Sequence, residues 1–199
     1  MTEIEGRTFS GDDWYGDELA KQVYRECAFF DVDITEGVNL GSTFENCTFG
    51  NVNFNASRHV DAAFLACTFR RCNFFDATFD GCKLVGSTFS ECTMRPLTVR
   101  GGDWSFVVLK ELDLRSAKFH DLRMREADLS GANCAKAEFV DVDLTGAQLA
   151  KVVFTRADLR GSELSALNPA NAELGKAIIE PRQAVTIAQA LGLEVRAPR

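Results

Sequence analysis

The chain has 199 residues, of which 46% are hydrophobic and 26% charged, a composition that fits one soluble domain or one continuous repeat array. Its net charge of −7 and pI near 4.9 argue against a nucleic-acid ligand and are compatible with a basic protein partner. The N-terminus does not resemble a signal peptide, and the longest plain apolar run, Phe106 to Leu109, is too short to cross a bilayer. We therefore expect a cytoplasmic protein with no membrane partner and with reduced cysteines.

An apolar residue recurs every five positions from Phe9 to Leu164 without a slip in register. Of the 32 positions in this series, 30 are apolar, and 13 of the 16 phenylalanines fall in it. We call this position i. At i−2 the side chains are small, as in Cys27 and Ala77, and position i+2 holds ten of the 15 glycines when Gly6, which precedes the series in the same register, is counted. Glycine supplies the positive φ that a sharp corner requires, so the pattern predicts a chain that turns every five residues.

Four such corners close a square of 20 residues. Stepping by 20 gives a column of like side chains: Phe9, Phe29, Phe49, Phe69, Phe89, Leu109, Leu129 and Leu149. Coils stacked at about 4.8 Å would pair their backbones as a parallel sheet does. The sequence therefore predicts an all-β fold, a right-handed quadrilateral parallel β-helix of about eight coils over residues 1–168, with a short helix in the C-terminal segment 169–199.

Runs such as Ala127-Asp128-Leu129-Ser130-Gly131-Ala132 match the A-[DN]-L-x-x pattern of the pentapeptide-repeat family, which the chain resembles from about Phe9 to Leu164. Within that family it is similar to the fluoroquinolone-resistance group, the Qnr and especially the MfpA-type proteins. The matching strings are Arg95-Pro96-Leu97-Thr98, Ala127 to Ala132, and Gln183-Ala184-Val185 leading to Gly192-Leu193. The resemblance implies a DNA mimic that binds DNA gyrase, a type II topoisomerase. The unbroken register leaves no room for the projecting loops of the looped Qnr proteins.

The C-terminal segment 169–199 is predicted to contain a helix from Glu180 to Leu191, with Pro181 in its first turn and Gly192 as its C-terminal cap. After this helix, the apolar residues Leu193 and Val195 alternate with other residues, which suggests a short strand. The segment either caps the open end of the rod or forms a twofold dimer contact, and the resemblance favours the dimer. The residues expected in that contact are Val185, Ile187, Ala188, Leu191, Leu193 and Val195.

The seven cysteines do not suggest a metal site. Cys27, Cys47 and Cys67 are spaced by 20, and no C-x-x-C pair occurs, so small buried thiols are expected, although stacked sulfurs could lie within disulfide range. No serine-histidine-carboxylate group, phosphate-binding glycine loop or inward carboxylate pair fits this frame. We therefore predict no catalytic residue, no metal, no cofactor and no small-molecule substrate.

Asn39 and His59 are the two polar residues at position i, and they lie 20 residues apart. They could form a site. We expect instead that they hydrogen-bond to each other, or that the backbone shifts and turns Leu40 and Val60 inward.

Acidic side chains gather in two places. Residues 1–50 hold eleven acids and three bases, a net charge of −8, and the tip of this region carries Asp12, Asp13, Asp17 and Glu18. A second group falls on one face and across its corner: Asp121, Glu138, Asp141 and Asp158, with Asp143 and Glu163. Either group could be an ordinary solvated surface. We favour the interpretation that these carboxylates take the place of DNA phosphates in the basic channel of a partner protein. The second group would then make the close contact with the channel, and the tip would steer the approach of the rod. A scaffold rod that binds a different protein through its acidic faces is the alternative.

Overall fold

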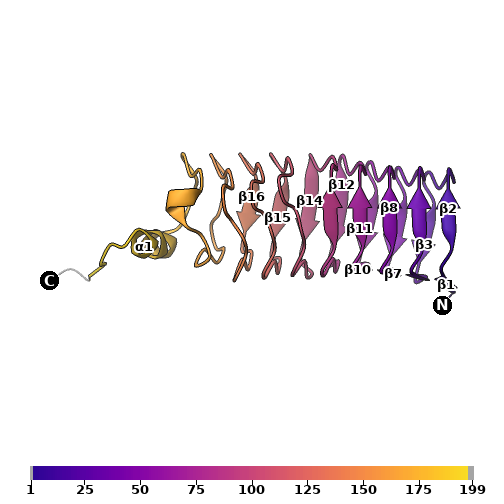
Figure 1. The fold of residues 1–199 in the computed structure, drawn as a ribbon, viewed down its shortest axis with the longest axis horizontal. Helices are drawn as coiled ribbons and strands as arrows, with labels where there is room; N and C mark the ends of the chain where they lie inside the picture. The colour runs from indigo at the N-terminus through magenta and orange to yellow at the C-terminus, as the bar shows by residue number, and fades with distance from the viewer. Residues whose placement is uncertain (1, 197–199) are drawn as a thin grey trace.

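The computed structural model describes residues 2–196, which form a straight rod of stacked coils followed by one α-helix at the C-terminal end (Figure 1). Each coil takes 20 residues and turns four corners, so four faces run along the rod. Every ladder is parallel and joins residues 20 apart, as Phe29 pairs with Phe49 and Phe49 with Phe69. The predicted four-sided parallel β-helix is therefore confirmed.

We number the faces in chain order. The first face is the sheet β1 (Glu3–Glu5), β4 (Val23–Arg25), β7 (Thr43–Glu45) and β10 (Ala63–Leu65), continued by single bridges from Lys83 to Asp143. The second face is the sheet β2 (Thr8–Ser10), β5 (Ala28–Phe30), β8 (Thr48–Gly50), β11 (Thr68–Arg70) and β13 (Thr88–Ser90), continued by bridges from Val108 to Gln148.

The third face has single-residue bridges only, first from Asp13 to Thr93 and then from Asp113 to Glu173. The fourth face is the longest sheet and is continued by bridges at Asp158 and Ile178. Its strands are β3 (Glu18–Ala20), β6 (Val38–Leu40), β9 (Arg58–Val60), β12 (Ala77–Asp80), β14 (Leu97–Arg100), β15 (Lys118–His120) and β16 (Glu138–Val140).

Phenylalanine rings fill the interior as continuous stacks. On the second face the ring centroids of Phe29 and Phe49, and of Phe49 and Phe69, lie 4.7 Å apart, with interplanar angles of 7° and 10°. The column continues below Phe89 with buried leucines, as the step of 20 predicts. Each stacked pair adds about 0.5–1.5 kcal/mol beyond the burial of its area, so the aromatic columns hold the coils in register without a metal or a disulfide.

The corners have the predicted positive φ at position i+2, but most of them are not glycine. Asp31 has φ of 56° and Arg71 has φ of 56°, while Gly11 has φ of 68°. A side chain in this region costs about 1–2 kcal/mol, which the stacked coils offset by hydrogen bonds such as Asp31 N to Gly50 O, at 3.0 Å. Pro96 departs from this geometry and follows a cis peptide bond.

Asn39 and His59 are both buried, with 2% of each residue exposed, and Asn39 Nδ2 lies 3.5 Å from His59 Nδ1. The other ring nitrogen of His59 lies 3.0 Å from the Ser57 hydroxyl, which donates to the backbone oxygen of Phe54. Burial lowers the pKa of His59 to about 3, so the ring is neutral. The predicted hydrogen-bonded pair is confirmed, and the alternative in which Leu40 turns inward is wrong because Leu40 is exposed.

The rod ends in a short 3₁₀ helix, η1 (Pro169–Asn171), and the α-helix α1 (Pro181–Ala190). The helix predicted from Glu180 to Leu191 is one residue shorter at each end, with Glu180 as its N-cap; Gly192, with φ of 81°, follows the last turn, as predicted. The strand expected at Leu193 and Val195 is wrong: residues 193–196 have no regular secondary structure, because no strand within residues 2–196 pairs with them.

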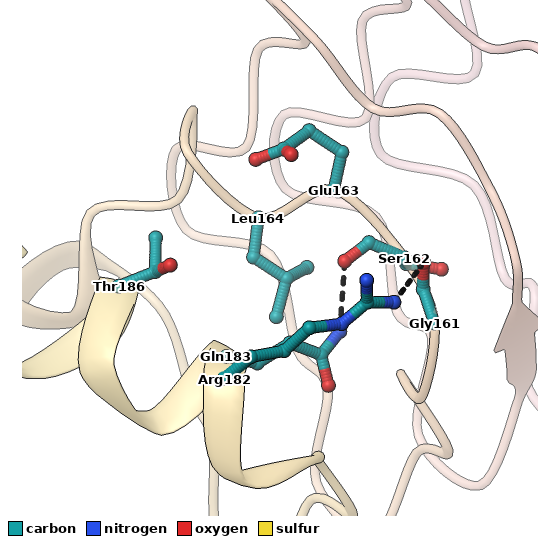
Figure 2. Close-up of a pocket in the computed structure, with 7 residues that line it drawn as sticks. All are labelled: Gly161, Ser162, Glu163, Leu164, Arg182, Gln183 and Thr186. Carbon is teal, nitrogen blue, oxygen red and sulfur yellow. Dashed lines mark hydrogen bonds between the residues drawn. The ribbon is translucent and has the colours of Figure 1, made fainter.

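Gln183 fixes α1 to the last coil. Its side-chain Nε2 donates to the backbone oxygens of Leu159, at 2.6 Å, and Ser162, at 2.8 Å, while its Oε1 accepts from the backbone nitrogen of Glu180 at 2.7 Å. Figure 2 shows Gln183 and Arg182 reaching from the helix toward Gly161 and Ser162. The surrounding cup is small, about 160 Å³. The polar contacts therefore cap the coil and do not form a ligand pocket.

Candidate protein-binding surface

The N-terminal end of the rod is covered by charged side chains. Arg7, Asp12 and Asp17 occupy i−2 positions, which hold small, inward residues such as Cys27 and Val32 in the coils that follow. Within residues 2–196 no coil covers this end, and these three side chains reach solvent; the Arg7 guanidinium lies 4.6 Å from the centre of the Phe9 ring. Charges at an open solenoid end also oppose end-to-end pairing of coils.

Asp13 and Glu18 complete the acidic tip that the sequence predicts. Asp13 accepts a hydrogen bond from the backbone nitrogen of Tyr15, and both acids are exposed. Within residues 2–196, none of the four tip acids (Asp12, Asp13, Asp17 and Glu18) forms an ion pair. The structure therefore leaves the charge of the tip uncompensated.

Half of the second acidic group is neutralised by basic partners. Glu138 lies 2.8 Å from His120 and 3.4 Å from Lys118. Asp158 is held by Arg160 at 2.6 Å, and the hydrogen bonds from this guanidinium outweigh burial and lower the pKa of the carboxyl. Asp143 lies 2.6 Å from Arg125; burial disfavours its charged form, but hydrogen bonds from Thr145 and Arg125 outweigh burial and lower its pKa. Three of the six carboxylates thus carry a basic partner.

The remaining members of this group lie at corners or bind the backbone. Asp121 and Asp141 are exposed corner residues, with φ of 53° and 55°. The Asp141 carboxylate lies over Gly161, where a side chain would collide with it. Glu163 Oε1 accepts from the backbone nitrogen of Ser165 at 2.8 Å. The six carboxylates of this group therefore lie along one edge of the rod. Because three of them are paired with basic side chains, this edge is not strongly negative.

The tail exposes apolar side chains on α1, at its C-cap and in the residues that follow it. Val185, Leu191, Leu193 and Val195 are exposed by 38%, 54%, 60% and 45%. Ile187 instead packs against the core, and Ala188 is half-buried. The sequence placed all six residues on one contact surface; the structure divides them between the rod and solvent.

All seven cysteines are free and buried, and the residues from 2 to 196 contain no cluster of three or more potential metal ligands. Burial raises the pKa of Cys134 well above its ordinary value and that of Cys82 to about 11, so these thiols are not poised as nucleophiles. In the described part of the chain, no helix has the length and apolar character needed to span a membrane.

Two sequence profiles match the middle and the C-terminal part of the rod. One, described as "Pentapeptide repeat region", covers residues 72–149, and another, "Pentapeptide repeats (8 copies)", covers residues 137–168. Together with the 20-residue coil, they decide the family. The chain is a pentapeptide-repeat protein. At the level of overall sequence, no curated protein matches it.

Solved structures share the fold of this pentapeptide-repeat protein at low sequence identity. A trypsin-treated variant of QnrB1, a plasmid-mediated fluoroquinolone resistance protein, superposes with a TM-score of 0.76 and 16% identity, over 98% of this chain and 100% of QnrB1. Full-length QnrB1 gives 0.73 and 16%, over 96% and 100%. HetL, a protein of the cyanobacterium Nostoc sp. strain PCC 7120 involved in heterocyst differentiation regulation, gives 0.53 and 14%, over 89% and 86%.

Proposed function

We propose that this protein binds DNA gyrase in the cytoplasm as a DNA mimic, modulates or inhibits the enzyme, and protects it from fluoroquinolones. Three observations support the proposal: the rod has the fold of QnrB1, its sequence carries the strings that resemble MfpA-type and Qnr proteins, and one end carries unpaired acidic residues. The protein acts by presenting a surface and has no catalytic role.

The observation that carries the proposal is the charge density of the first two coils. Residues 2–41 contain ten acids and three bases, a net charge of −7. Two coils occupy roughly 10 Å of the rod axis. Duplex DNA carries one negative charge per about 1.7 Å of axis, or about six over the same length. This segment, which we call the acidic segment, therefore matches DNA in linear charge density.

The charges of the acidic segment are also available. Only Glu3 among its acids forms an ion pair, with Arg25, which also contacts Glu45 in the next coil. Asp13 and Asp33 lie in paired positions on consecutive coils of the third face. At physiological salt, charges are screened within about 8 Å, so a basic channel responds to carboxylates presented at its wall. We therefore propose that the acidic segment makes the close contact, and that the half-neutralised second group contributes less.

The tail 169–199 is proposed to form the homodimer contact. Val185, Leu191, Leu193 and Val195 form an apolar surface that a second copy of the chain would cover, and the α-helix that carries Val185 is held to the rod by Gln183. Pairing through the tails would place the two acidic segments at opposite ends of a longer rod. A dimer would then offer two DNA-like ends to one or two gyrase surfaces.

A supercoiling assay tests the function directly. Purified DNA gyrase is assayed with relaxed plasmid, with and without a fluoroquinolone, across a range of protein concentrations. The proposal requires inhibition of supercoiling, or restoration of activity in the presence of the drug. If neither effect occurs and no complex with gyrase forms at low salt, the protein is a scaffold rod for a different partner.

A further inference from the structure

Backbone hydrogen bonds join each coil to the next at regular positions. Among residues 2–196, several are missing at the last junction, at Leu144 and Gly146, and several more are missing at one junction midway along the rod. On the third face Thr93 N donates to Cys72 O at 3.0 Å and Asn133 N donates to Leu112 O at 2.9 Å. Among residues 2–196, the equivalent bond from Asp113 N to Cys92 O does not form. The ladder of bridges stops at the same place, because Thr93 and Asp113 are not paired.

Neighbouring donors at this junction are also missing. Phe74 N and Leu114 N each donate to the next coil at 2.8 Å, but in the described chain Met94 N has no such bond. Glu91 N has none either, although Arg71 N and Glu111 N do, in the coils before and after it. Pro96 has no N–H to donate. The third face and its corner with the second face are therefore unpaired here.

The other three faces stay continuous across the junction. Thr88 pairs with Val108 on the second face, and β14 pairs with β15 on the fourth. On the first face, opposite the gap, bridges run through Lys83, Asp103 and Arg123. A rod bonded on three sides and unbonded on one can open on the unbonded side by bending toward the opposite face.

Side chains replace the missing backbone bonds. Arg95 Nε lies 2.9 Å from Asp113 Oδ2, and this ion pair joins the two coils across the gap. Arg115 binds the same carboxylate through Nε and Nη2, each at 2.8 Å. The hydrogen bonds from Arg115 are the main reason that the pKa of Asp113 is lowered, and Arg95 contributes to the same effect. The ion pair is half-exposed, so it is a weak and reversible link.

The surface of the rod is hollowed on both sides of the gap. A groove of about 580 Å³ is lined by Glu91, Cys92 and Leu112, among others, and a second of about 460 Å³ by Phe75, Pro96 and Arg115. Cys92 is 9% exposed, whereas the other six cysteines are exposed by 1% or less. Segments with few backbone bonds and accessible core residues are those that open first.

We propose that this junction is a hinge, which divides the rod into an N-terminal block, residues 2–96, and a C-terminal block, residues 103–180. The hinge opens on the third face, and the Arg95–Asp113 ion pair closes it. It lies near β14, about midway along the rod in Figure 1. The hinge allows the rod to follow a curved protein surface, which a uniformly bonded β-helix would resist. This inference stands whether or not gyrase is the partner.

The test measures the distance between the two blocks by double electron–electron resonance, with spin labels at Thr35→Cys and Thr155→Cys on the third face. Cys92 lines the groove at the junction and is replaced by alanine in the labelled protein; the other six native cysteines are exposed by 1% or less and stay unlabelled under native conditions. In the labelled protein that is otherwise unchanged at the hinge, the distance distribution should be broader than the rotamers of the spin label alone would produce. Asp113→Asn should broaden it further and lengthen its mean by several ångströms, because the third face opens.

Asp158→Asn is the matched control. Asp158 binds Arg160 as Asp113 binds Arg115, but it lies in a continuous ladder between Glu138 and Ile178, so its loss should leave the distribution unchanged. Amide exchange gives a second readout on the unlabelled protein. Phe89 N and Val108 N, which bond across the junction, should exchange at least tenfold faster than Phe69 N and Thr88 N one coil earlier. A narrow distance distribution in both the wild-type background and Asp113→Asn would overturn the hinge. Equal rates of amide exchange at these four backbone nitrogens would overturn it as well.

Discussion

The side-chain amide of Gln183 donates to the backbone oxygen of Ser162 at 2.8 Å, where a further coil would have placed a backbone N–H. In the coil before, the backbone nitrogen of Glu163 donates to Val142 O at 3.0 Å, 21 residues earlier, and Asp143 N donates to Leu122 O at 2.9 Å. Residue 183 continues this series through its side chain. The helix can therefore end the stack without leaving this carbonyl unpaired.

Replacing Gln183 by leucine should detach α1 from the rod while leaving the β-helix intact. The change removes both donors and leaves the backbone nitrogen of Glu180 without its acceptor, at a cost of roughly 1–3 kcal/mol for unsatisfied polar groups. Hydrogen exchange of residues 184–190 should become at least tenfold faster. Gln189→Leu, at an exposed position on the same helix, is the control and should not change it. Unchanged protection in Gln183→Leu would show that apolar packing alone docks the helix.

Stability should fall between pH 7 and pH 5 because of His59. Its folded pKa of about 3 lies below the ordinary value of 6.5, so the unfolded chain binds the additional proton as the pH drops. The contribution is complete above pH 7, and by pH 5 the loss is about 2 kcal/mol. Urea unfolding at the two pH values measures it. The double variant Asn39→Leu, His59→Phe should unfold with the same midpoint at both. If it keeps the wild-type pH dependence, the sensitivity arises elsewhere.

Neutralising the acidic tip should weaken binding to gyrase more than neutralising the second group. The fourfold variant Asp12→Asn, Asp13→Asn, Asp17→Asn, Glu18→Gln removes unpaired charges and should lower affinity about tenfold or more, chiefly through the association rate. It should also reduce the dependence of affinity on salt. Titration at 50 and 200 mM salt measures both effects.

Asp141→Asn with Asp143→Asn should have a smaller effect, because Asp143 is already bound by Arg125 and Asp141 lies against Gly161. An affinity that responds neither to salt nor to either set of changes would refute DNA mimicry while leaving the fold untouched. The reverse ranking would move the close contact to the second group.

Placing a charge on the tail should separate the proposed dimer. Val185→Asp or Leu191→Asp puts a carboxylate on a side chain that is exposed in one copy and that the proposed dimer would cover, so folding should be spared and association lost. Light scattering should report a monomer, with an unchanged circular dichroism spectrum. An unaltered dimer mass would exclude these residues from the contact.

The sequence predicts the fold in detail because the period of five places each side chain. Asn39 and His59 were expected to be neighbours from their spacing alone, and they are. The same periodicity assigns acids to faces but does not show which bases reach them. Arg125 reaches Asp143 from 18 residues away, across a coil, and such pairing depends on side-chain conformation rather than on register.

The missing hydrogen bonds on the third face were not predicted, because the five-residue register continues through them. Met94 and Leu114 keep the register on both sides of the gap, so the pattern gives no sign that the bridge between Thr93 and Asp113 is missing. Pro96 was the available signal, because a residue without an N–H cannot donate to the next coil. Gln183 lies beyond the repeat, so the five-residue period could not predict that its side chain donates to the backbone oxygens of Leu159 and Ser162.

The 20-residue register also limits how such a chain can change in length. Duplicating or deleting one whole coil alters the rod by about 4.8 Å and returns every later residue to its original face. A change of five residues keeps each apolar side chain inside but rotates everything downstream by a quarter turn. In this protein it would turn the apolar surface of the tail relative to the acidic segment, so the two could change relative orientation while the core composition stayed the same.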